Sequence, residues 1–243
     1  MRDLKVRSFG FILITGFLLV ACGGNNITEA TKEPAAGNPA SNTDLQLDPA
    51  NANNENARAA AGYLYESLVA AQDGKAVGAL AESWSVSDDG LDYIFNLRPG
   101  VSFHDGTSLN VDAVIANFDR WFDPANPRRG AGKFAAWASA FNGFKGETAE
   151  DGKAKSQYDG IEKVNELTVL VHLNTPDPEF LGKIADPAFS IVSPAILNAG
   201  SGDGGTNMYK FAGKNGSSLT LVPFAGYWNA ASIPSKGMEV PFE

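Results

Sequence analysis

Apolar and polar residues alternate along several stretches of the chain, which is the pattern of strands with one face in a core. Residues 91–97 place Leu91, Tyr93, Phe95 and Leu97 on one face, and residues 167–173 place Leu167, Val169, Val171 and Leu173 on one face. The stretch "SLTLVPF" predicts a further strand over residues 218–224. Two shorter apolar stretches, residues 101–103 and "FSIVSP" at 189–194, predict a short partner strand and a short buried strand.

Helical spacing is clearest between residues 111 and 122. Apolar side chains recur there three and four positions apart, Asn110 stands at a capping position, and Pro124 follows the end. Residues 55–71 pair Leu64 with Leu68 and Tyr65 with Val69 at four-residue spacing, which predicts an amphipathic helix. Residues 177–185 predict a short helix. Helices and strands mix irregularly, which is typical of the α/β or α+β class.

The first 21 residues have the features of a signal peptide. Three basic residues precede an apolar stretch over 9–20, which is shorter than the roughly 20 residues that a membrane-spanning helix needs. Cys22 follows at once, and it is the sole cysteine of the chain. The sequence "LVAC" resembles the lipobox of bacterial lipoproteins, which implies cleavage before Cys22 and a lipid on its sulfur. The alternative is a short buried helix that carries an incidental cysteine.

A linker is expected between this cysteine and the folded part of the protein. Residues 23–43 contain no aromatic side chain and a single large aliphatic one, Ile27. Such a composition is typical of a flexible linker, so residues 22–44 are interpreted as the lipidated cysteine and its tether. No second apolar stretch approaches membrane-spanning length.

Composition and charge narrow the class of function. The chain has 243 residues, of which 44% are hydrophobic, so it has enough apolar side chains for one or two domains. Its formal net charge is −9, which argues against a nucleic-acid partner because such binding depends on clustered Lys and Arg.

No stretch of the sequence indicates catalysis or a metal site. The match of "GSGDGG" to a dinucleotide-binding pattern lacks the required strand before it and helix after it, so it predicts a surface loop. His104 and His172 lie 68 positions apart; we interpret His104 as a turn residue and His172 as solvated. Aromatic side chains are expected in the core for Trp84 and Phe95, whereas those of residues 134–144 fit either a core or an apolar cleft.

The order of these segments resembles one protein family. "LDPANANNENARAAAGYLYESLV" and "LAESWSVSDDGLDYIFNLRPGVSFHDG" resemble the bacterial extracellular solute-binding proteins of family 5, the peptide-, dipeptide- and nickel-binding lipoproteins of ABC importers. The resemblance continues through "GIEKVNELTVLVHLNTPDPEFLGKIADPAFSIVSP" to "LTLVPFAGYWNAASIP", over about residues 45–238. One departure is Asn207-Met208, where the family usually has Gly-Pro.

This resemblance implies a periplasmic-binding-protein-like fold of type II that closes around its ligand. Residues 45–68 and 188–243 would form an incomplete domain I, and residues 69–187 a mixed α+β domain II. Family members are about twice as long, so a third domain would begin near the end of this sequence. Under this resemblance, the residues expected to contact a ligand are Asn51, Ala52 and Asn53, which follow "LDP", and Tyr65 at the edge of the cleft. The alternative is that Asn51, Asn53 and Asn54 simply form a turn and a helix cap.

The resemblance also implies partners and a location. The expected partners are an oligopeptide or another small solute and the permease subunits of an ABC importer, with no cofactor. The lipid on Cys22 would hold the protein on the outer face of the cell membrane. The alternative function is a non-transporting surface lipoprotein that acts through protein partners, and nickel or haem-like ligands are alternatives to peptides.

Overall fold

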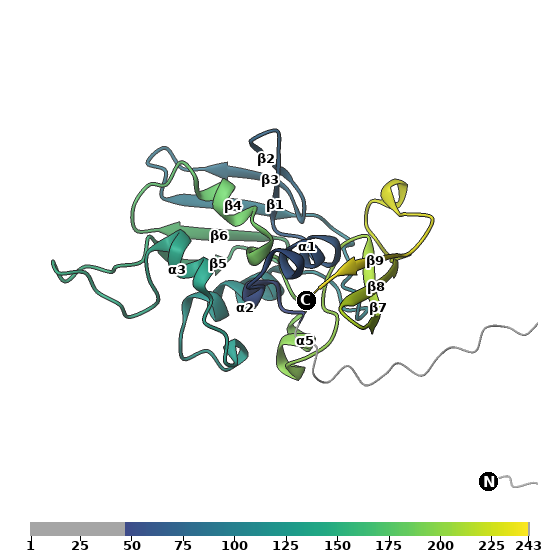
Figure 1. Cartoon of the computed structure of the whole chain (residues 1–243). Coiled ribbons are helices and arrows are strands. Elements are labelled where there is room, and N and C mark those ends of the chain that lie inside the picture. Colours follow the sequence, from purple (N-terminus) through teal and green to yellow (C-terminus); the bar gives the residue numbers. More distant parts are fainter. Residues whose placement is uncertain (1–46, 243) are drawn as a thin grey trace, which may run out of the picture. The chain divides into compact units, whose positions relative to one another are not determined.

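A computed structural model describes residues 47–242 of the chain (Figure 1). The predicted signal peptide, Cys22 and the linker lie outside the described residues. The described part contains three antiparallel sheets with helices packed against them. Within residues 47–242, no helix combines the length and the apolar character needed to cross a membrane.

The largest sheet has four strands in the order β3-β4-β6-β5, with β4 and β6 at its centre. Its strands are β3 (Ala81–Val86), β4 (Asp92–Leu97), β5 (Tyr158–Lys163) and β6 (Thr168–Leu173). Register places Phe95 opposite Val169 and Tyr93 opposite Val171, and all four side chains are buried. The two alternating stretches of the sequence are therefore confirmed as neighbouring central strands.

Helix α2 (Val111–Phe122) supplies the apolar layer that packs against this sheet. Asn110 caps it, because its side-chain oxygen accepts from the backbone N–H of Ala113, as the sequence predicts. The ring centres of Phe118 on α2 and Tyr158 on β5 lie 5.8 Å apart. This first core also holds Phe134, Trp137 and Phe141, so three of the aromatic residues that fitted either a core or a cleft belong to the core. The fourth, Phe144, is partly buried against it. Trp84 is only partly buried at its edge.

A second, smaller core lies between helix α1 (Glu55–Leu64) and a three-stranded sheet in the order β7-β8-β9. These strands are β7 (Tyr209–Asn215), β8 (Ser218–Pro223) and β9 (Met238–Pro241). All buried members of this core come from residues 47–65, Val192 and residues 219–240. These positions fall inside the ranges expected for domain I, whereas Ala50, Leu68, Phe189 and Ile191 of those ranges join the first core. The domain boundaries themselves stay a prediction.

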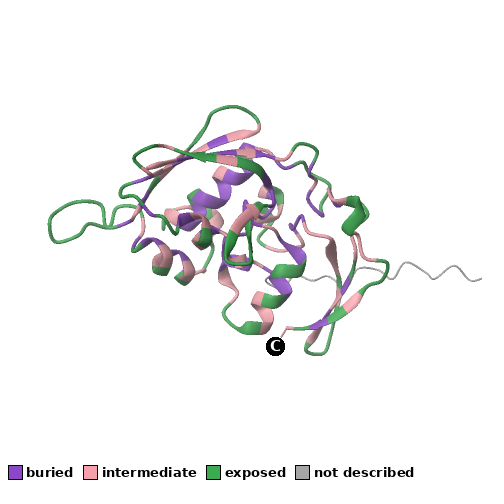
Figure 2. Ribbon diagram, turned by 90° about the horizontal axis from the view of Figure 1, so that it is seen from above, coloured by how far each residue is buried: buried purple, intermediate pink, exposed green. Residues whose placement is uncertain are grey.

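The remaining elements connect and flank the sheets (Figure 1). Figure 2 shows how far each residue along the ribbon is buried. A hairpin of β1 (Val69–Gln72) and β2 (Lys75–Gly78) forms the third sheet. Three short helices are α3 (Ala135–Phe141), α4 (Phe180–Ile184) and α5 (Pro194–Ala199), and α4 confirms the helix predicted over residues 177–185. Four single turns of 3-10 helix are η1 (Pro49–Asn51), η2 (Pro127–Arg129), η3 (Pro187–Phe189) and η4 (Ala230–Ser232).

The helix predicted over residues 55–71 is wrong in its second half. Helix α1 ends at Leu64, and Tyr65 is already extended with φ −124° and ψ 158°. The side chain of Asn207 donates to the carbonyl oxygens of Gly62 and Tyr65, while its backbone N–H donates to that of Leu64. Asn207 therefore donates to carbonyl oxygens that, in a longer helix, would accept from the backbone N–H groups of the next turn. Leu68 and Val69 lie in the first core instead.

The predictions of short strands over residues 101–103 and 189–194 are also wrong. Residues 190–193 are buried but irregular, because their backbone groups bond to Glu66, to the side chain of Asn117 and to Gly204 rather than to a strand. Residues 101–103 do not pair with β4. They fold back on residues 107–109 through a single bridge between Ser102 and Ser108.

Candidate functional site

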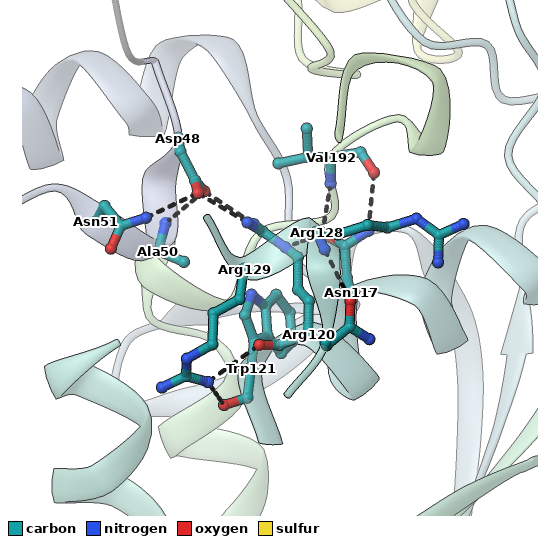
Figure 3. Close-up of polar contacts among 10 residues, drawn as sticks. Asp48, Ala50, Asn51, Asn117, Arg120, Trp121, Arg128, Arg129 and Val192 are labelled. Carbon is teal, nitrogen blue, oxygen red and sulfur yellow. Dashed lines mark hydrogen bonds and ion pairs between the residues drawn. The ribbon is translucent and has the colours of Figure 1, made fainter. Parts of the chain in front are cut away.

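A buried ion pair joins the start of the described chain to helix α2 (Figure 3). Nη1 of Arg120 donates to Oδ2 of Asp48 at 2.7 Å, and Nη2 donates to Oδ1 at 2.8 Å. The Arg120 side chain is 1% exposed and that of Asp48 is 16% exposed. Such a two-pronged contact is strong and directional. This ion pair holds residues 48–51 against helix α2.

Asp48 is ionised because its partners outweigh its burial. Burial raises the pKa of Asp48, but the hydrogen bonds and charge of Arg120, with donors from Ala50 and Asn51, hold that pKa below its usual value. The Nδ2 group of Asn51 lies 2.9 Å from Oδ2, and the backbone N–H of Ala50 lies 3.1 Å from Oδ1. The carboxylate thereby also caps the 3-10 turn η1.

Asn117, one turn earlier on α2, carries the network to the irregular segment 190–193. Its Nδ2 donates to the carbonyl oxygen of Val192 at 2.8 Å, and its Oδ1 accepts from the N–H of Val192 at 3.2 Å and from Nε of Arg120 at 3.3 Å. Asn117 is fully buried. Figure 3 shows Asp48, Arg120, Asn117 and Val192 in one connected chain of polar contacts. Helix α2 is thus bonded to residues 48–51 through Asp48 and to residues 190–193 through Val192.

Two cavities flank this ion pair. The one we call the asparagine cavity has a volume of about 210 Å³, and its lining includes Asn51, Ala52, Asn53 and Tyr65. The one we call the arginine cavity has a volume of about 220 Å³, and its lining includes Arg120, Arg128, Arg129 and the loop from Gly200 to Gly202. Leu47, Asp48 and Tyr65 line both.

The structure brings the four ligand-contact candidates of the sequence analysis to one cavity. Asn51 lies in η1 and binds Asp48, while Ala52 and Asn53 follow it. Tyr65 is 3% exposed, and burial raises the pKa of its hydroxyl well above the usual value, with the charges of Asp203 and Asp48 adding to the effect. Asn54 caps α1, so a turn and a helix cap are both present in this segment. Contact of these four residues with a solute stays a prediction.

Arg128 and Arg129 are site residues that the sequence reasoning missed. Arg129 donates through Nη1 to the carbonyl oxygens of Arg120 and Trp121, and its guanidinium lies 4.3 Å from the ring centre of Phe134. Nε of Arg128 donates to Oδ1 of Asn198 at 2.8 Å. Burial, with the charge of Arg120, lowers the pKa of Arg129. The dipeptide stands in a stretch without helical or strand periodicity, so pattern analysis passes over it.

Two further clusters link distant segments. Glu66 accepts from the hydroxyls of Thr206 and Tyr227 and from Nε1 of Trp228, at 2.9 to 3.2 Å, and burial raises its pKa although these donors oppose the rise. His104 is buried, with Nδ1 2.7 Å from Asp203 and Nε2 2.8 Å from the carbonyl oxygen of Asn207. His104 lies in a turn, as the sequence predicts, because the backbone N–H of Gly106 donates to the carbonyl oxygen of Phe103. The sequence does not predict its burial, which comes from the loop 200–207 that covers it.

Within residues 47–242, no group of three His, Cys, Asp or Glu side chains has the arrangement of a metal site. The "GSGDGG" segment forms a loop as the sequence predicts, although Gly204 and Gly205 are buried rather than at the surface. It contributes Asp203 to the His104 cluster. The polar side chains around Asp48 hold segments together and line cavities.

Comparisons with known proteins identify the family of this chain. Residues 75–240 match the family described as bacterial extracellular solute-binding proteins, family 5 Middle. The glutathione-binding protein GsiB of Pectobacterium atrosepticum is 34% identical over 195 residues, which are 77% of this chain and 34% of that protein. The chain thus spans about a third of the length of the curated relatives that it matches.

Solved structures agree with this match. The periplasmic binding protein DppA of Helicobacter pylori, in complex with the peptide STSA, has a TM-score of 0.65 and 25% identity, covering 82% of this chain and 40% of that one. The murein tripeptide-binding protein MppA of Escherichia coli has a TM-score of 0.65 and 25% identity over 81% of this chain and 40% of that one. The described residues are thus a mixed α/β fragment of a periplasmic-binding-protein fold. The chain belongs to the bacterial extracellular solute-binding proteins of family 5, a family of binding proteins rather than enzymes.

Proposed function

We propose that this chain is the N-terminal portion of the substrate-binding lipoprotein of an ABC importer that takes up peptides or peptide-like solutes. The family match over residues 75–240 carries this proposal. The relatives named above bind glutathione or peptides, which makes a peptide backbone the expected common feature of the ligand.

The geometry around Tyr65 supports a binding role. Asn51, Ala52 and Asn53 line the asparagine cavity together with Tyr65, and the Asp48–Arg120 pair holds the backbone of this segment in place. A ligand would meet amide side chains and backbone groups here, which are the usual means of orienting a small polar solute. Small-molecule sites usually have volumes of about 300–1,000 Å³. Both cavities are smaller than that, so each would take one end of a solute.

The proposal includes a domain division and a location. Residues 45–68 and 188–243 would belong to domain I and residues 69–187 to domain II, in a type II binding-protein lobe. Ligand capture would be followed by hinge closure and docking on permease subunits. Residues 1–21 would act as a signal peptide, and lipid on Cys22 would anchor the protein on the outer face of the membrane, since two or more acyl chains hold a protein there stably.

Calorimetric titration of the protein purified from its own host tests this function. The ligands are dialanine, trialanine, tetraalanine and glutathione. We expect saturable binding of at least one of them. Binding of none of the four would contradict the proposal and would favour a surface lipoprotein that acts through protein partners.

A further inference from the structure

His104 contacts the loop 200–207 at three points. Its backbone N–H donates to the carbonyl oxygen of Gly205 at 2.8 Å. In its ring, Nδ1 lies 2.7 Å from Oδ1 of Asp203, and Nε2 lies 2.8 Å from the carbonyl oxygen of Asn207. The side chain of His104 is 0% exposed and that of Asp203 is 11% exposed, so solvent has little access to these contacts. One residue therefore holds the loop in place.

Both partners of the imidazole ring are acceptors of hydrogen bonds. A backbone carbonyl oxygen cannot donate, so Nε2 carries a hydrogen toward Asn207. The carboxylate of Asp203 accepts as well, because its Oδ1 takes the N–H of Gly205 at 3.2 Å and its Oδ2 takes the N–H of Phe211 at 2.6 Å. Only the protonated ring, the imidazolium, donates from both nitrogens. The geometry therefore fits a charged His104 paired with a charged Asp203.

Loss of one proton would break this arrangement. A neutral ring keeps a single N–H, so its other nitrogen would direct a lone pair at Asp203 or at the carbonyl oxygen of Asn207. The ring of Phe224 packs against the imidazole with the ring centres 4.8 Å apart, and in such a buried site an unpaired polar group is costly. Histidine in an unfolded chain loses its proton at about pH 6.5, which lies within the pH range that proteins encounter in cells.

The other charged groups near this ring are accounted for. Burial raises the pKa of Asp105, the neighbour of His104, but hydrogen bonds from Ser193 and Thr107 hold that pKa below its usual value. Nζ of Lys210 on β7 donates to the carbonyl oxygen of His104 at 3.3 Å. Glu66 reaches the loop through the hydroxyl of Thr206, and burial raises the pKa of Glu66 although its donors oppose the rise. A test must therefore separate His104 from Glu66.

The loop that His104 holds is also a wall of the arginine cavity. Its first residues, Gly200 to Gly202, line that cavity together with Tyr65. Its last residue, Asn207, donates to the carbonyl oxygens of Leu64 and Tyr65 at the end of α1. Burial raises the pKa of the Tyr65 hydroxyl well above its usual value, so that group stays neutral. A change at His104 would therefore reach both the cavity wall and the end of α1.

We propose that His104 is a pH-sensitive latch: its protonated ring holds the loop 200–207 against the end of α1, and loss of the proton loosens this wall of the arginine cavity. The contribution of the charged contact is present below about pH 6.5 and is lost as the pH rises through the value at which the folded ring deprotonates. The inference goes beyond the proposed function and does not depend on which solute the protein binds.

Hydrogen exchange followed by mass spectrometry tests the latch in the full chain purified from its host. Rates are measured at pH 5.5 and pH 8.0 and divided by the intrinsic rates of an unfolded chain at the same pH. The reporter is the peptide over residues 200–211, whose bonded amides include those of Gly205, Asn207 and Phe211. We expect its protection to fall at least about tenfold from pH 5.5 to pH 8.0, while that of helix α2 stays constant. Equal protection of the reporter at both pH values, or an equal fall in α2, would overturn the inference.

Two variants assign the pH response to one histidine, since the chain has just two. In His104→Gln the amide cannot titrate, so we expect the reporter to exchange equally at both pH values, as fast as in the wild type at pH 8.0. His172→Gln is the matched control, because His172 lies on β6 and its Nδ1 is 2.7 Å from Asp92, a residue outside the loop. It is expected to keep the response of the wild type.

Glu66 is present in both variants, so its titration cancels when they are compared. A full pH response in His104→Gln, or an equal loss of the response in the two variants, would overturn the latch. If His104→Gln does not fold, the comparison of the wild type at the two pH values decides alone. None of these outcomes bears on the binding of peptides, so the proposed function stands or falls separately.

Discussion

Replacing Arg120 with glutamine is expected to lower the free energy of unfolding by about 3–5 kcal/mol at pH 7. Glutamine cannot supply the two ionic hydrogen bonds to Asp48, so a carboxylate that is 16% exposed loses its counter-charge. The same substitution removes the bond from Nε to Asn117, which holds Val192. Urea unfolding followed by tryptophan fluorescence measures the loss.

The pH dependence of this loss identifies its cause. In the wild type the pKa of Asp48 is held below its unfolded value of about 3.9, so the stability from the pair is present above that pH and is lost as the pH falls through the folded value. Without Arg120, burial dominates and raises the pKa of Asp48, so the variant gains relative stability as the pH falls. The cost of Arg120→Gln should therefore shrink between pH 7 and about pH 3.

A double variant separates the ion pair from simple packing. Asp48→Leu combined with Arg120→Met replaces both charges with apolar groups, and such replacements are often neutral or stabilising. We expect the double variant to recover most of the stability that Arg120→Gln loses. A cost of Arg120→Gln below about 1 kcal/mol, or a cost independent of pH, would contradict the buried-pair interpretation.

Substituting Gly205 with alanine is expected to destabilise the fold by about 3 kcal/mol or more. An added Cβ would lie 1.9 Å from the carbonyl oxygen of Leu64 and 3.0 Å from Cε1 of His104. Both neighbours are fixed, because Leu64 O accepts from Asn207 and the His104 ring lies between Asp203 and Asn207. Relief requires the loop to move away from the end of α1, which also carries Tyr65.

Gly213→Ala is the matched control for Gly205→Ala. Gly213 lies on β7, and a Cβ there would meet no atom within 4 Å. We expect its unfolding midpoint in urea to stay near that of the wild type, since glycine-to-alanine changes at compatible sites shift stability by less than about 1 kcal/mol. Equal stability of the two variants would show that the loop 200–207 does not approach Leu64 as described.

Local patterns predict those elements whose cause is local. Helix α2 is predicted with its Asn110 cap because its apolar spacing and its cap lie within one stretch of sequence. Strands β4, β6 and β8 are predicted for the same reason, because apolar and polar residues alternate within each short stretch and one face of each strand packs in a core. Family resemblance then points to Asn51, Ala52, Asn53 and Tyr65, which the structure brings to one cavity.

The rest depends on contacts between residues far apart in the sequence. Helix α1 ends at Leu64 because Asn207, 143 positions later, takes its last carbonyls. His104 is buried because the loop 200–207 covers it, and Arg120 is buried because Asp48 lies opposite. Arg128 and Arg129 stand in an aperiodic segment, so their cavity emerges only when α5 and the loop after it are in place.

Uptake by living cells tests the proposed import function most directly. The measurement is the initial rate at which the host takes up radiolabelled trialanine, dialanine and glutathione, before and after deletion of the gene. We predict that deletion lowers the uptake of at least one of these solutes and that the restored gene returns the rate to that of the wild type. Unchanged uptake of all three after deletion would contradict an import function for this protein.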